Sequence, residues 1–131
     1  MGDVYLINFE GSGSVQRGIR PGVIFQNNIG NEYSPNVVVL PLTTNLRKSS
    51  MPTHVLLRAN DTGLAMDSVV LCENPQCIPK QQLGRYLTKL PSKYIGVIAA
   101  ASIMASAAIS YLEPDALMNI WQRATDMNGT A

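Results

Sequence analysis

The arginine best placed to do chemistry stands between a loop and an apolar segment. Arg20 follows a Gly/Ser-rich stretch, residues 11–14, and precedes Pro21, which fixes φ and stiffens the entry into Val23-Ile24-Phe25. Active-site residues favour such junctions between loop and scaffold. A guanidinium there could grip a phosphate through two parallel hydrogen bonds and stabilise charge developing on its oxygens. From these residues alone, an arginine that pairs with an acid to hold the loop is a slightly better explanation.

Two further side chains are candidates, each with a simpler alternative. Thr43 ends a β-branched run, where its hydroxyl could donate to a phosphoryl oxygen, although threonine at a strand end usually satisfies a turn backbone. His54 could carry protons near neutral pH, but a partly exposed strand histidine is the commoner case. Cys72, after Val69-Val70-Leu71, is interpreted as a small core residue. No Cys/His set could hold a structural zinc, so we expect chemistry without metal or cofactor.

The amino-acid composition restricts the classes of protein to which the chain can belong. The chain has 131 residues, is 46% hydrophobic and 15% charged, and carries a net charge of +1. These values predict one domain with a real core and exclude a strongly basic nucleic-acid coat protein. Neither a P-loop, a dinucleotide-binding glycine motif nor a G-x-S-x-G elbow is present. If Arg17, Arg20, Arg47 and Lys48 share one face, they form an anion-binding surface; solvated loop charges are an equally good interpretation.

The elements that must position these side chains are short strands followed by helices. Turn residues separate apolar or β-branched runs, including turn signals at 27–31 and 60–63, and the runs predict strands at 4–9, 21–27, 37–42, 52–57, 68–72 and 85–90. After Pro91 the spacing of the apolar residues changes to the period typical of helices. The predicted fold class is therefore mainly β with C-terminal α-helices (α+β). Residues 1–112 form the main unit, and 113–131 are a helical extension of the same domain.

Residues 94–112 are nineteen consecutive residues without a charge, long enough to cross a bilayer. Six alanines and three serines dilute the run, which favours a helix buried on every face, or lining a dimer, over a membrane span. Ser92 is the predicted cap, and Glu113-Pro114-Asp115 ends this helix and begins another. That second helix has one apolar face. The first residues lack the basic and apolar regions of a signal peptide, so we expect a soluble cytoplasmic protein.

Several motifs in matching order make the sequence resemble the MazF/PemK family of bacterial toxin endoribonucleases, over about residues 2–112. They are Gly2-Asp3-Val4-Tyr5, Gly18-Ile19-Arg20-Pro21, residues 24–31, Ser34-Pro35, residues 37–43, Pro52-Thr53-His54-Val55, and Asp67-Ser68-Val69 with Glu73 beyond. The resemblance implies an SH3-like or CcdB-like small β-barrel that forms a homodimer. It also implies a separate antitoxin protein as partner.

The same resemblance implies metal-independent cleavage of single-stranded RNA. The 2′-hydroxyl attacks the adjacent phosphate and leaves a 2′,3′-cyclic phosphate and a 5′-hydroxyl. Arg20 corresponds to the family arginine that acts in proton transfer and phosphate stabilisation, and Thr43 to its strand-end threonine. With a pKa above ~12, an arginine serves better as an electrostatic stabiliser than as a base. The residues expected to contact RNA are Ser14, Gln16, Arg17, Asn27, Thr44, Arg47, Lys48, His54 and Asn74.

Two other functions remain open at this point. Related gyrase-poisoning toxins share the fold without ribonuclease chemistry, so a non-catalytic poison or binding module is the alternative. Arg20 and Thr43 occurring together favour the enzyme. A membrane-anchored protein is the third reading, and it depends on residues 94–112.

Overall fold

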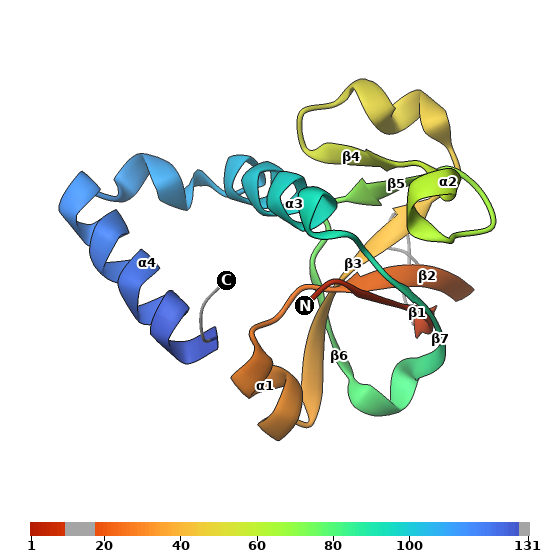
Figure 1. Cartoon of the computed structure of the whole chain (residues 1–131), viewed down its shortest axis with the longest axis horizontal. Helices are drawn as coiled ribbons and strands as arrows, with labels where there is room; N and C mark the ends of the chain where they lie inside the picture. Colours follow the sequence, from red (N-terminus) through yellow and green to blue (C-terminus); the bar gives the residue numbers. More distant parts are fainter. Residues whose placement is uncertain (10–17, 129–131) are drawn as a thin grey trace.

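The structure is a computed structural model that describes residues 1–9 and 18–128. Its framework is an antiparallel sheet in the order β4-β5-β3-β2-β1-β7, with β6 also paired to β3 (Figure 1). The strands are β1 (Asp3–Phe9), β2 (Gly18–Ile24), β3 (Asn36–Thr43), β4 (His54–Leu57), β5 (Ser68–Leu71), β6 (Gln76–Pro79) and β7 (Leu83–Lys89).

Strand β3 is the centre of this sheet. Along one edge it pairs with β2, and along the other edge it pairs first with β6 and then with β5. The sheet is open: among the described residues no ladder joins β7 at one end to β4 or β6 at the other. The expected mainly-β class with C-terminal helices is confirmed, and the sheet of the expected small barrel is not closed in the described part of the chain.

Two apolar clusters cover the two faces of the sheet, because successive strand residues point to opposite sides. Helix α3 (Ser92–Ala105) covers the first; the second lies over β1, β2, β3 and β6. The first contains Val4, Val23, Leu40, Leu42, Val55, Leu57, Val70, Cys72, Leu90, Ile98 and Ala101. The second contains Ile7, Phe9, Ile24, Val37, Val39 and Ile78.

Cys72 is a core residue, as predicted, and burial raises the pKa of its thiol to about 11. Each large apolar side chain in these clusters contributes about 1.5–3 kcal/mol relative to an exposed one.

Short helices occupy the two stretches predicted as turns. Asn27 caps α1 (Asn28–Tyr33), and its Oδ1 accepts a hydrogen bond from the Gly30 N–H at 2.8 Å. Helix α2 (Ala59–Thr62) ends at Gly63, whose φ of 78° lies in the left-handed region that favours glycine. Three 3₁₀ turns complete the connections: η1 (Leu46–Ser50), η2 (Lys80–Gln82) and η3 (Ala107–Tyr111).

The predicted strands at 4–9, 37–42, 52–57, 68–72 and 85–90 are confirmed to within about two residues. The strand predicted at 21–27 lies earlier, as β2, because Asn27 already caps α1. Strand β6 was not predicted, since Gln76 and Pro79 give it little β-propensity.

The C-terminal helices differ from their prediction. Helix α3 begins directly after Pro91, so Ser92 is its first residue rather than its cap, and it ends at Ala105. Within the single chain only one face of α3 is buried, through Ile98 and Ala101, so burial on every face is not reached there. The alternative, a helix that lines a dimer, stays a prediction.

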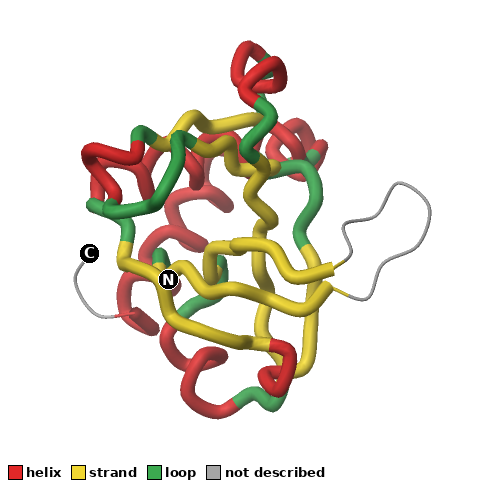
Figure 2. Tube along the Cα trace, turned by 90° about the vertical axis from the view of Figure 1, so that its right-hand side faces the viewer, coloured by secondary structure: helices red, strands yellow, loops and turns green. Residues whose placement is uncertain are grey.

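Helix α4 (Pro114–Asn128) stands away from the sheet and touches α1 (Figures 1 and 2). No helix within the described ranges is long and apolar enough to cross a membrane.

Candidate active site

Arg20 lies in β2, and Thr43 lies in the neighbouring strand β3. The recorded pairs run from Ile24 opposite Val39 to Gly22 opposite Pro41. The ladder between β2 and β3 ends at Gly22 and Pro41. Continued two residues past that last pair, its register sets Arg20 opposite Thr43, and opposite residues of an antiparallel pair share a face of the sheet. Arg20 is exposed and Thr43 is half-buried at the last position of β3. The open end of these two strands therefore presents a cation beside a hydroxyl.

The Thr43 hydroxyl already makes one contact. The Asn45 N–H donates to Thr43 Oγ1 at 3.2 Å, so the threonine does satisfy the turn that follows β3. A hydroxyl has two acceptor lone pairs and one proton. Accepting from Asn45 thus leaves the proton for donation, and the structural and the chemical interpretations of Thr43 are compatible.

His54 lies on the same face as Thr43. Thr43 is opposite Val69, and His54 is opposite Leu71, two residues further along β5. The imidazole is buried, with 3% of its side chain exposed, and its Nε2 lies 2.7 Å from Glu73 Oε1. The interpretation of His54 as a partly exposed strand histidine is therefore wrong.

Glu73 is the acidic partner of that histidine. Burial acts to raise the pKa of the Glu73 carboxyl, but the hydrogen bond from His54 and further hydrogen bonds outweigh it, so the pKa lies below its ordinary value of 4.5. The carboxylate is consequently ionised at neutral pH. It adds one fixed negative charge to this side of the sheet.

The other predicted RNA contacts are dispersed around these positions. Asn27 caps α1, Thr44 and Arg47 are exposed after β3, and Asn74 is half-buried in the turn between β5 and β6. The Arg47 N–H donates to Asn45 Oδ1 at 3.2 Å, which orders the start of η1. Ser14, Gln16 and Arg17 lie outside the described residues, as does the side chain of Lys48. The proposed cationic face thus stays a prediction.

A groove of about 450 Å³ opens on the other face of these strands, where Pro21 and Thr44, the residues after Arg20 and Thr43, line it. Leu6, Pro21, Thr44, Met66 and Arg85 are among its lining residues. Sequence reasoning assigned only Thr44 to a site, and it also missed the pairing of Glu73 with His54. The predicted strands 52–57 and 68–72, treated as a hairpin, could have placed those two side chains together. Within the described part of the chain, no three His, Cys, Asp or Glu residues gather as metal ligands do.

Residues 1–102 match the family model described as PemK-like, MazF-like toxin of type II toxin-antitoxin system. The chain belongs to this family. Endoribonuclease MazF of Staphylococcus saprophyticus is 44% identical over 93 residues, which are 70% of this chain and 78% of that protein. Endoribonuclease EndoA of Bacillus subtilis is 36% identical over 111 residues, 84% of this chain and 96% of that protein.

Solved structures of PemK/MazF toxins share the fold. Mycobacterium tuberculosis toxin MazF-mt6 aligns with a TM-score of 0.67 and 29% identity, over 79% of this chain and 94% of its own. A mycobacterial endoribonuclease in complex with its cognate antitoxin aligns with a TM-score of 0.68 and 26% identity, over 86% and 96%. The match to the PemK/MazF family model ends within α3, so α4 lies beyond it.

Proposed function

We propose that this protein is the toxin of a toxin–antitoxin pair and a metal-independent endoribonuclease that cleaves single-stranded RNA. The proposal is supported by the register of β2 on β3, which, continued two residues past its last pair, Gly22 opposite Pro41, sets Arg20 opposite Thr43. Family membership supports the proposal, because relatives that align with this chain over most of their own length are named endoribonucleases.

In the proposed reaction the RNA supplies its own nucleophile. The 2′-hydroxyl gives its proton to solvent water and its oxygen bonds to the adjacent phosphorus. The bond from phosphorus to the 5′-oxygen breaks, and the 5′-oxygen takes up a proton from water. Negative charge accumulates on the non-bridging oxygens in the transition state. The Arg20 guanidinium offsets this charge, and the Thr43 hydroxyl donates a hydrogen bond to one of the non-bridging oxygens. Each such donor stabilises the transition state by roughly 3 kcal/mol. Arg20 acts as a cation rather than as a base, because its pKa is above ~12.

The remaining contacts extend the site along the RNA. Thr44, Arg47, Asn27 and Asn74 form the described part of the proposed RNA surface, and Ser14, Gln16, Arg17 and Lys48 belong to the same proposal. His54, which the sequence predicted as an RNA contact, is buried against Glu73 and is not part of that surface. We place the toxin in the cytoplasm as a homodimer, with a separate antitoxin as its protein partner. The structural neighbour that is an endoribonuclease in complex with its cognate antitoxin supports that partner.

The test is cleavage of a long single-stranded RNA in EDTA by the purified protein. Arg20→Ala and Thr43→Val should each lower the cleavage rate by about 10²–10³, the usual cost of removing one transition-state donor. Thr43→Ser, which keeps a hydroxyl, should retain most of the activity. Arg123→Ala, an exposed arginine of α4, is the matched control and should cut like the parent.

The products give a second readout. The 5′ fragments should end in a 2′,3′-cyclic phosphate. The proposal is wrong if the parent cuts no RNA, or if Arg20→Ala and Thr43→Val both cut at the parent rate. The first result would favour a non-catalytic poison on the same fold.

A further inference from the structure

The groove of about 450 Å³ that Pro21 and Thr44 line has an apolar floor. Leu6 and Pro21 are directly opposite each other in the β1–β2 ladder, so their side chains share a face, and Leu87 of β7 lines the same groove. This volume is within the usual range for small-molecule sites. Apolar walls of this kind suit the flat faces of a nucleobase, which single-stranded RNA can turn outward.

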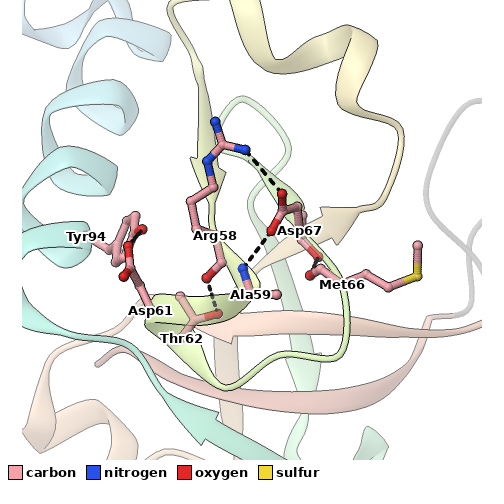
Figure 3. A network of polar contacts seen from close by, with 8 residues as sticks. Arg58, Ala59, Asp61, Thr62, Met66, Asp67 and Tyr94 are labelled. Carbon is pink, nitrogen blue, oxygen red and sulfur yellow. Dashed lines mark hydrogen bonds and ion pairs between the residues drawn. The ribbon is translucent and has the colours of Figure 1, made fainter.

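One wall of the groove is the segment from α2 to β5, which includes Met66. A polar network fixes this segment (Figure 3). Asp67 accepts from the Ala59 N–H at 2.7 Å and from Arg58 at 3.2 Å, and these hydrogen bonds, the first foremost, hold the pKa of Asp67 below its ordinary value. The Thr62 hydroxyl donates to the Arg58 carbonyl at 2.9 Å. The wall is therefore ordered before any ligand arrives.

Two more bonds tie that wall to its surroundings. The Thr88 hydroxyl of β7 donates to the Thr62 carbonyl at 2.7 Å, which joins the wall to the floor. On the far side, Tyr94 of α3 donates to Asp61 at 2.7 Å. A site held from two directions loses little conformational freedom on binding.

The rim of the groove carries side chains that can donate hydrogen bonds. Arg85 is exposed, and no acidic group among the residues placed in the structure forms an ion pair with it. Its guanidinium has five N–H donors and no acceptor, so it suits the acceptor-bearing edge of a base. Thr44 adds an exposed hydroxyl at the same rim. Within this lining, Arg85 is the charged residue.

The groove also lies close to the proposed reaction centre. Pro21 and Thr44 line it, and they directly follow Arg20 and Thr43 in the chain. Neighbouring Cα atoms are about 3.8 Å apart. Because consecutive strand residues face opposite sides, an RNA strand that passes over the end of β2 and β3 would meet both places.

We propose that this groove binds one nucleobase of the RNA substrate, next to the phosphodiester that is cut, and that Arg85 reads its acceptor edge. The inference rests on the proposed ribonuclease function and adds a specificity subsite to it. A nucleobase fits better than a protein segment because the charged group at the rim, Arg85, is a hydrogen-bond donor and the floor residue Pro21 directly follows the proposed catalytic Arg20. RNA supplies both the acceptors and the phosphate.

The experiment compares cleavage of a randomised single-stranded RNA by the full chain and by variants, with the cut positions read by sequencing. Arg85→Gln removes the cation, and Ala65→Trp fills the groove from an exposed position of its wall. Each should lower kcat/KM about tenfold on the preferred sequence and flatten the base preference at one position flanking the cut. Lys89→Gln is the matched control, since it removes an exposed cation of β7 outside the groove.

The outcomes separate this proposal from the one on which it rests. If Arg20→Ala abolishes cutting while Arg85→Gln and Ala65→Trp keep the parent rate and preference, the base subsite is wrong and the ribonuclease stands. If those two variants keep the cleavage rate and base preference of the parent but are no longer inhibited by an antitoxin, the groove binds the antitoxin and the base subsite is again wrong. If the parent cuts no RNA, both proposals fall.

Discussion

The sheet and the last helix of this PemK/MazF-family toxin are built in opposite ways. In the sheet, the apolar residues of both clusters are at most 6% exposed. In α4, Met118 is 65% and Trp121 62% exposed. Charge divides likewise: residues 1–112 hold nine Lys and Arg against six Asp and Glu, whereas 113–131 hold one against three. The stability of the fold therefore comes from the sheet, and α4 adds little to it.

The largest expected difference between the two regions comes from Leu42→Ala. Leu42 is 2% exposed in the first cluster, and shortening it removes buried surface and leaves a cavity. We expect the free energy of unfolding to fall by about 2–5 kcal/mol. Urea unfolding followed by circular dichroism measures it. A loss below about 1 kcal/mol would contradict the view that this cluster carries the fold.

Glu73→Gln tests how much one ionised side chain adds to the stability of the sheet region. The pKa of Glu73 is lowered in the folded protein, so its carboxylate stabilises the fold above about pH 4.5, and this contribution is lost as pH falls toward the folded-state pKa. With 35% of the side chain exposed, solvent screening limits the effect to about 1 kcal/mol at pH 7.

Urea unfolding of both proteins from pH 7 to pH 3 tests this effect. The difference in unfolding free energy should shrink below pH 4.5. A difference that stays constant over the range would show that the ionised carboxylate contributes nothing.

Trp121→Ala should have the smallest effect. Its side chain is mostly exposed, so we expect the free energy of unfolding to change by less than about 0.5 kcal/mol. Circular dichroism in urea suits both proteins, because Trp121 is the chain's single tryptophan and the variant has no tryptophan fluorescence. A loss as large as that of Leu42→Ala would mean that the apolar face of α4 is covered, and the contrast between the regions would disappear.

The sequence predicted best where one physical signal dominates. Residues 37–42 are apolar throughout and largely β-branched, and they form β3, the strand buried at the centre of the sheet. Asn27–Asn31 contain turn residues, but Asn27 caps a helix instead, which composition cannot distinguish from a turn. Helix α3 ends early because the Ser106 side chain accepts from the Ala108 N–H and starts a 3₁₀ turn.

The candidate site was less predictable from the residues. The family resemblance, not the spacing, singled out Arg20 and Thr43 together, since their juxtaposition needs the register of β2 on β3. His54 and Glu73 are 19 residues apart and meet only through the β4–β5 hairpin. Arg85 and Met66 carry no motif at all; only the folded chain brings them to one groove.

The pairing of the first strand with the last has a consequence for synthesis on the ribosome. Asp3 is opposite Lys89, and the Leu90 N–H donates to the Gly2 carbonyl at 3.0 Å. A nascent chain must therefore wait until about residue 90 has emerged before β1 gains its outer neighbour. Such distant pairings close late in folding. The sheet is therefore complete only after about two thirds of the chain has left the ribosome.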